Sequence, residues 1–234
     1  MQPAELIQRA RREGRKSLDE QSGKALLAAY GIAVPRSVLV RGADEVVGAI
    51  AQLTPPWVVK VASPDILHKS DAGGVKVKLQ SAVEVQQAIE AMMVQPVIAR
   101  SRLDGFLVEE MAPAGQEIVI GGVRDADFGP LVMVGLGGIF VEVLADVAFR
   151  ICPITPLDAE DMVAELKGKA ILDGARGGKA VSKPAIVEAL LKLGGEDGLL
   201  LRHASDIQEA DVNPLIVSDR GAIAADARFV LTRS

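Results

Sequence analysis

Short alternating segments that follow one another in pairs constrain the fold of this 234-residue chain most strongly. The pairs are 57–62 with 74–79, 106–111 with 117–123, and 208–217 with 222–231. Each reads as a β-strand that returns after a short connection rich in turn-forming residues. Helical periodicity fills the stretches between them, near 81–100, 158–166 and 184–193. Strands joined in this way are antiparallel, so the pattern predicts an α+β fold with mixed or antiparallel sheets rather than a regular α/β array of βαβ units.

Proline and glycine suggest where the chain divides. The run Ala112-Pro113-Ala114-Gly115 interrupts two predicted strands, and no internal repeat or low-complexity linker is visible elsewhere. A chain of this length can form one large domain or two smaller lobes. We therefore expect an N-terminal lobe at 1–111, which includes a leading helix capped by Ser17 and Glu20, and a C-terminal lobe at 112–234.

Composition excludes several classes of partner. The formal net charge is −5, so no overall basic field exists for nucleic acid. No apolar run reaches the length of a transmembrane helix, so we expect no membrane partner. Cys152 is the only cysteine, which rules out an internal disulfide and fits a cytoplasmic location.

The first strand pair carries a lysine where an apolar residue is expected. Lys60 follows Val58-Val59, and Gly73 and Gly74 open the returning strand. An unpaired buried ammonium is costly, so Lys60 must reach an anion or solvent. One interpretation is an edge strand with a solvated lysine and an ordinary tight turn. The other is a lysine and a glycine loop that bind phosphate through exposed N–H groups, although the spacing is not that of a Walker P-loop.

His68, one of only two histidines, lies between that lysine and the glycine pair. A single loop histidine is ordinarily a solvated residue. Its position near Lys60 favours contact with the terminal phosphate of a nucleotide, because an imidazole nitrogen can attack phosphorus and hold it as phosphohistidine. The flanking segment 65–72 has mixed charge and few core-forming residues, so we expect it to move.

The last strand pair carries hard oxygen ligands. Asp211 and Asn213 are two residues apart and share one face of a strand, and Asp226 falls on the returning strand. Two carboxylates and an amide oxygen, completed by water and phosphate oxygens, suit Mg²⁺. Glu209 lies on the same face as a further ligand or an outer group. The alternative is an Asx turn that leads into Pro214.

Acidic residues also flank the predicted lobe boundary. Glu109 and Glu110 end an apolar strand just before Met111, and Glu117 opens the next strand. The acidic residues on the first strand either contact a ribose or adenine, or face water. Farther along, Arg176 lies in a glycine-rich segment where it can bind phosphate or a partner subunit.

Taken together, four segments resemble the ATP-grasp subunit or domain of ADP-forming acyl-CoA synthetases, such as acetate–CoA ligase (ADP-forming). The segments are SLDEQSGKALLAAYGIAVP, VVKVASPDILHKSDAGGVKVKL, FLVEEMAPAGQEIVIGGVRDADFGPLVMVGLGGIFVEVLADVAFRICPI and EADVNPLIV. The resemblance implies an ATP-grasp fold in which two lobes clasp a nucleotide. The β subunit of succinyl-CoA synthetase is similar in its Asn-Pro-Leu hairpin but is not expected to carry this extra histidine.

The resemblance also assigns roles to residues. It implies that His68 takes a phosphoryl group from a histidine of a partner subunit and passes it to ADP. The remaining positions are nucleotide contacts at Lys60, Gly73, Gly74, Glu110, Met111 and Glu117, and Mg²⁺ ligands at Asp211, Asn213 and Asp226.

The implied reaction is acyl-CoA + ADP + phosphate ⇌ carboxylic acid + CoA + ATP, with ATP/ADP and Mg²⁺ as cofactors. The CoA-binding and ligase domains of the complete enzyme are absent. We therefore expect a β subunit that needs a separate α subunit in a hetero-oligomer such as α₂β₂; the initial methionine favours a natural subunit over a fragment of a fused enzyme. Two other functions stay open, namely a non-catalytic ATP-sensing module and an ATP-grasp ligase that joins a carboxylate to an amine.

Overall fold

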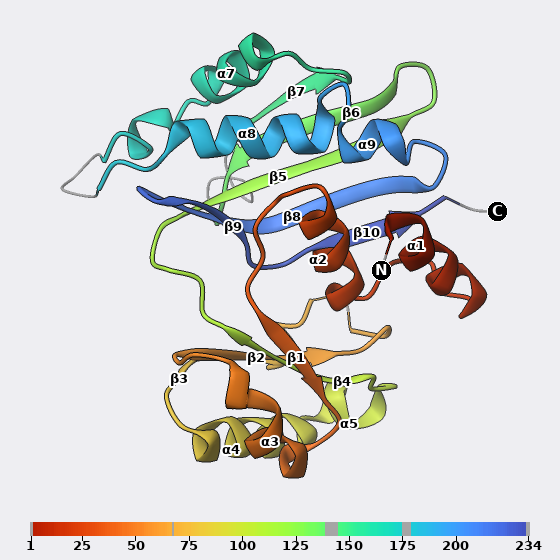
Figure 1. Cartoon of the computed structure of the whole chain (residues 1–234), viewed down its shortest axis with the longest axis vertical. Helices are drawn as coiled ribbons and strands as arrows, with labels where there is room; N and C mark the ends of the chain where they lie inside the picture. The colour runs from red at the N-terminus through yellow and green to blue at the C-terminus, as the bar shows by residue number, and fades with distance from the viewer. Residues whose placement is uncertain (1, 67, 139–144, 175–178, 233–234) are drawn as a thin grey trace. The chain divides into compact units, whose positions relative to one another are not determined.

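The computed structural model describes residues 2–66, 68–138, 145–174 and 179–232. It divides the chain into two compact units: a smaller unit, Pro35–Ala112, and a larger unit that combines Met1–Val34 with Pro113–Ser234. Each unit contains one antiparallel sheet and its own helices, which confirms the predicted α+β class (Figure 1). Among the described helices, none is long and apolar enough to cross a bilayer.

The smaller unit is a four-stranded sheet in the order β1-β4-β2-β3. The strands are β1 (Ser37–Val40), β2 (Trp57–Ala62), β3 (Val75–Leu79) and β4 (Gly105–Glu110). The helical segments are η1 (Ala43–Glu45), α3 (Val46–Ala49), η2 (Ile50–Gln52), α4 (Ala82–Met93) and α5 (Pro96–Arg100). Figure 1 shows α3 and α4 on one side of this sheet.

Helix α4 shows how the local sequence produces this packing. The Ser81 hydroxyl accepts a hydrogen bond from the Glu84 N–H, so this serine is the N-cap of the helix. Val85, Ile89 and Met92 repeat at helical spacing, and all three are buried against the same cluster as β2. Burial of each such side chain contributes about 1.5–3 kcal/mol. The helix predicted to continue to residue 100 breaks before α5, because a proline cannot continue the hydrogen-bond ladder.

The larger unit contains a six-stranded sheet in the order β10-β8-β5-β6-β7, with β9 also paired to β8. Its strands are β5 (Gln116–Asp125), β6 (Gly129–Leu136), β7 (Val147–Ile151), β8 (Ile207–Ser218), β9 (Gly221–Ala224) and β10 (Arg228–Leu231). Its helices are α1 (Pro3–Arg12), α2 (Glu20–Ala29), α7 (Pro156–Glu165), η3 (Lys169–Ile171), α8 (Lys183–Gly194) and α9 (Leu199–Arg202). Helices α8 and α9 run along one face of the sheet (Figure 1).

The N-terminal helices belong to the larger unit, so their predicted place in a lobe at 1–111 is wrong. Leu26 and Leu27 of α2 are fully buried in the same cluster as Phe229 of β10. A backbone hydrogen bond also joins the N-terminal segment to β10, because the Leu18 N–H donates to the Phe229 carbonyl at 2.9 Å. The sequence of an amphipathic helix shows which face is apolar but not which sheet covers that face. The prediction placed the helix with the strands that follow it in the sequence, and this choice is wrong. The other predicted boundary, near Pro113, coincides with the observed division.

Candidate functional site

Lys60 lies on a central strand, so the edge-strand interpretation is wrong. Strand β2 pairs with β4 on one side and with β3 on the other. The Lys60 side chain is 8% exposed, and its Nζ lies 2.8 Å from a carboxylate oxygen of Glu109, which is 2% exposed. Charges this deeply buried are tolerated when they are paired.

The turn that carries His68 is closed by its own backbone. The Ala72 N–H donates to the His68 carbonyl at 3.3 Å, and the Gly74 N–H donates to the Lys69 carbonyl at 2.7 Å. The His68 side chain is exposed. These bonds hold the histidine at the surface of a compact turn that leads directly into β3.

The chain entering this turn is also anchored. The Asp65 carboxylate accepts a hydrogen bond from the Arg102 N–H at 2.8 Å, and Ile66 is buried in the core of the smaller unit. Both ends of the segment 65–72 are therefore fixed in this structure. Its movement remains a prediction, and any movement must break these contacts.

Glycine is required at positions 73 and 74 for different structural reasons. Gly73 has φ of +69°, a left-handed conformation that side chains other than glycine adopt at a cost. Gly74 is required by space, because a Cβ there would lie 2.4 Å from Cγ1 of Val61. The Gly74 carbonyl accepts a hydrogen bond from the Val61 N–H at 2.8 Å. The glycine pair thus fixes the position of the His68 turn beside β2, one residue from Lys60.

Glu110 and Met111 are held by the smaller unit itself. The Arg36 guanidinium donates to both carboxylate oxygens of Glu110, and the Thr54 N–H donates to one of them at 2.7 Å. The hydrogen bond from Arg36 lowers the pKa of Glu110 below its ordinary value, so the carboxylate is ionised. The Met111 N–H donates to the Pro56 carbonyl at 2.9 Å. Their role as nucleotide contacts remains a prediction.

Strand β8 keeps the predicted metal ligands off the core. Ala210, Val212, Leu215 and Val217 are buried, whereas Asp211 is half-buried and Asn213 is exposed. The pairing with β5 shifts register between Val212 and Leu215, so β8 has one residue more than β5 in this interval. This bulge lets the strand bury apolar side chains on both sides of it while Asp211 and Asn213 stay on the other face.

Asp226 does not lie on a strand, which corrects the prediction of one continuous returning strand. It falls in the connection 225–227 between β9 and β10. Pro214 has no N–H, so the regular ladder stops opposite it, and the Pro214 carbonyl instead accepts the Ala225 N–H at 2.9 Å. The break brings Asp226 to the edge of the sheet at the level of the bulge in β8.

Glu117 shares the sheet face of Asp211. Gly121 is the register partner of Asp211, and alternation along β5 puts Glu117 on the side of Gly121. Ile118 and Ile120 point the other way, into the core beneath the helices. The Glu117 side chain is exposed, and its role as a nucleotide contact remains a prediction.

The chemistry of this donor set fits a magnesium ion with few protein ligands. Burial raises the pKa of Asp211, and the negative charges of Glu209 and Asp226 raise it further. Carboxylates that repel one another in this way are stabilised by a bound cation. The described residues contain no group of three or more Asp, Glu, His or Cys side chains in metal-binding geometry. Asp211, Asn213 and Asp226 would therefore share Mg²⁺ with water and phosphate oxygens.

Sequence reasoning missed Arg228, the first residue of β10. It is the register partner of Asp211, and its positive charge opposes the rise in the pKa of that carboxylate. Its neighbours Ala227 and Phe229 are buried in the core, so Arg228 lies on the opposite face. The only signal in the sequence is its position two residues after Asp226.

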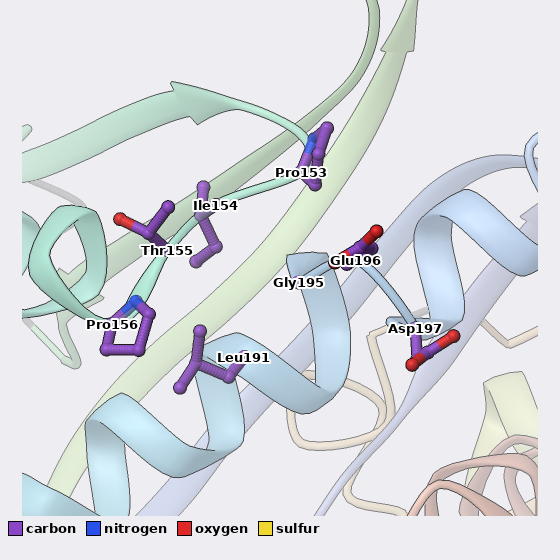
Figure 2. A pocket seen from close by; sticks show the side chains of 8 residues that line it. All are labelled: Pro153, Ile154, Thr155, Pro156, Leu191, Gly195, Glu196 and Asp197. Carbon is purple, nitrogen blue, oxygen red and sulfur yellow. The ribbon is translucent and has the colours of Figure 1, made fainter.

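Arg176, the other cation that the sequence suggested for phosphate, lies outside the described residues. A pocket opens between the connection that precedes α7 and the end of α8, as Figure 2 shows. Its lining residues are Pro153, Ile154, Thr155, Pro156, Leu191, Gly195, Glu196 and Asp197. They include two acidic side chains and no cation, which does not suit a phosphate.

Known proteins match this chain along almost all of its length. The family described as the ATP-grasp domain matches residues 9–231. The β subunit of acetate–CoA ligase (ADP-forming) I from Pyrococcus furiosus is 41% identical over 229 residues, which are 97% of each chain.

Solved structures give the same result. Dinucleotide forming acetyl-coenzyme A synthetase 1 from Ca. Korarchaeum cryptofilum, in complex with coenzyme A and Ca-AMPCP, matches with a TM-score of 0.92 at 39% identity, covering 99% of this chain and 100% of that chain. Another structure of that enzyme is described with Mg-AMPPCP and a phosphohistidine segment pointing towards the nucleotide binding site. It matches with a TM-score of 0.84 at 39% identity, and the coverage is 99% and 100%.

Proposed function

Because this chain belongs to the ATP-grasp family and matches a β subunit of ADP-forming acetate–CoA ligase over 97% of both lengths, we propose that His68 is its phosphoryl carrier. The chain is a nucleotide-binding phosphotransfer subunit of an ADP-forming acyl-CoA ligase. The overall reaction is acyl-CoA + ADP + phosphate ⇌ carboxylic acid + CoA + ATP. The subunit's part is the exchange of one phosphoryl group between a histidine and ADP.

The observation that carries the proposal is the construction of the His68 turn. An exposed imidazole is presented by a turn whose backbone bonds and glycine pair fix it beside the strand of Lys60. A lysine beside an exposed histidine suits phosphate, whereas the Gly73 and Gly74 N–H groups already donate to the Ser70 and Lys69 carbonyls and serve to hold the turn. The relative described with a phosphohistidine segment supports the same role.

The proposed chemistry balances in both directions. In the direction of ATP synthesis, the terminal oxygen of ADP attacks phosphorus of phosphohistidine, the P–N bond breaks, and His68 is released. In the reverse direction a neutral imidazole nitrogen attacks the γ-phosphorus of ATP, the P–O bond to ADP breaks, and a P–N bond forms. Lys60 offsets the negative charge of the phosphates that it contacts. Mg²⁺, held by Asp211, Asn213 and Asp226, would neutralise phosphate charge.

We further propose a separate partner subunit with the CoA-binding and ligase functions. The relative from Pyrococcus furiosus is called subunit beta, which supports an assembly of unlike subunits such as α₂β₂. This chain alone would then exchange phosphate with ADP but leave the acyl-CoA reaction incomplete.

Reconstitution with an α subunit tests the proposal. ATP formation from acyl-CoA, ADP and phosphate is measured for the wild type, for His68→Asn, and for His203→Phe, which changes the only other histidine. We expect His68→Asn to lose overall activity while it still binds nucleotide, and His203→Phe to retain activity.

Two results would contradict this function. Full activity of His68→Asn would exclude the carrier role. Nucleotide binding by the wild type without any turnover in the presence of the α subunit would favour an ATP-sensing module instead.

A further inference from the structure

Arg228 is a half-buried guanidinium with no partner in the described part of the chain. Its Nε is shielded from solvent and has no hydrogen-bond partner there. Its side chain also makes no ion pair with any described carboxylate, although Asp211 faces it across the strand pair. A shielded N–H left without a partner costs about 1–3 kcal/mol, so a group kept in this state needs an explanation.

A structural counter-ion does not explain it. Asp211 is the register partner of Arg228, and a guanidinium that served only to neutralise this carboxylate would form a hydrogen-bonded pair with it. Arg228 acts on Asp211 through space without that contact. Its terminal NH2 groups thus make no hydrogen bond within the described residues, and they belong to a side chain on the face that carries the proposed magnesium ligands.

We propose that Arg228 binds a phosphate oxygen beside the magnesium ion, as part of the phosphotransfer site. The inference rests on the proposed function. The guanidinium fork matches phosphate oxygens, and a fixed cation next to a metal stabilises the charge of a transferring phosphoryl group. The carboxylates would hold the metal and Arg228 the anion, which explains why oppositely charged neighbours in register stay unpaired.

Equilibrium binding to the full chain tests this assignment without any need for turnover. Calorimetry with Mg²⁺ and the non-hydrolysable triphosphate AMPPCP compares the wild type with Arg228→Gln and with Arg228→Lys, which keeps the charge but loses the fork. Arg220→Gln is the matched control, because Arg220 is an exposed arginine in the β8–β9 turn of the same hairpin. Thermal unfolding confirms that each variant is folded.

The expected loss for Arg228→Gln is about tenfold to a hundredfold in AMPPCP affinity, the usual value of a hydrogen bond to a charged group. AMP affinity should change less than twofold, as should AMPPCP affinity of Arg220→Gln. Arg228→Lys should lie between the wild type and Arg228→Gln. These results would assign the anion to the nucleotide.

A second experiment tests whether the anion bound by Arg228 is the phosphoryl group on His68 instead of a phosphate of the nucleotide. If AMPPCP affinity is unchanged but ADP discharges phosphorylated His68 at least tenfold more slowly in Arg228→Gln, the bound anion is the phosphoryl group on histidine, and the proposal holds. If neither quantity changes and Mn²⁺ binding, measured by electron paramagnetic resonance, becomes tighter, Arg228 only offsets carboxylate repulsion and the proposal is overturned. If the wild type itself does not bind AMPPCP, the proposed function fails first.

Discussion

Substitution of Gly74 by alanine should displace the His68 turn, and the structure gives the size of the effect. An added Cβ would lie 2.4 Å from Cγ1 of Val61 and 3.1 Å from the Lys69 carbonyl oxygen. Carbon atoms pack best at about 3.5–4.0 Å, so either the turn or Val61 must move by about 1 Å. Val61 is 1% exposed and cannot turn toward solvent.

The expected cost of Gly74→Ala combines two effects. Overpacking in a filled core costs about 1–3 kcal/mol. The shift also strains two hydrogen bonds of the Gly74 backbone, each worth about 0.5–1.5 kcal/mol. We expect the smaller unit to lose about 2–3 kcal/mol of stability. The rate of His68 phosphorylation should fall as well, because the turn that presents the imidazole moves.

Val61→Ala tests whether the contact with Cγ1 of Val61 causes the destabilisation of Gly74→Ala. Alone it removes buried methyl groups and costs about 2 kcal/mol. In the double variant Cγ1 of Val61 is gone, so the combined cost should be smaller than the sum of the single costs by about 1–2 kcal/mol, and phosphorylation should partly return. Gly48→Ala is the control, because no atom lies within 4 Å of the added Cβ in α3.

Urea unfolding followed by fluorescence measures these stabilities, since the only tryptophan, Trp57, lies on β2 of the smaller unit. The reasoning is refuted if Gly74→Ala is as stable and active as Gly48→Ala. It is also refuted if the costs of Gly74→Ala and Val61→Ala add within about 0.5 kcal/mol.

Three further predictions concern the larger unit. Burial lowers the pKa of His203 from its ordinary value of 6.5. As pH falls through 6.5 the unfolded chain therefore binds more protons than the folded chain, and the stability of the fold decreases. His203→Phe should flatten the pH dependence of Tm, and an unchanged slope would contradict this prediction. Burial raises the pKa of the Cys152 thiol to about 12. The native protein should therefore resist thiol-specific alkylation, which should proceed readily once the chain is unfolded in urea. Rapid labelling of the folded chain would refute the burial. Without metal, Asp211→Asn should raise Tm by about 2–4 °C, because the substitution relieves repulsion with Glu209 and Asp226. The same variant should lose the rise in Tm that Mg²⁺ causes in the wild type. A lower Tm without metal would contradict the repulsion.

Local signals in the sequence predicted local structure well. The sequence predicts a strand at 57–62 from a short apolar segment rich in β-branched residues, and β2 has those bounds. The helix expected near 81–100 begins at the cap Ser81, whereas the leading helix expected to be capped by Ser17 and Glu20 has Asp19 as its N-cap. Such features depend on neighbours along the chain, which the sequence displays directly.

Features that depend on register and packing could not be read in this way. The partner of Lys60 is Glu109, which the sequence left as either a nucleotide contact or a solvated residue. Asp226 leaves the ladder because of Pro214 on the opposite strand. Arg228 looks like any polar residue in an alternating strand until the pairing puts it opposite Asp211. Each of these depends on which strands pair and in which register.

Phosphorylation of the isolated chain by ATP labelled at the γ-phosphate tests the central claim most directly. The account predicts a label that requires Mg²⁺, is lost in acid as expected for a P–N bond, is discharged by ADP, and is absent from His68→Asn but present in His203→Phe. An acid-labile label of normal yield in His68→Asn would contradict the assignment of His68 as the phosphoryl carrier.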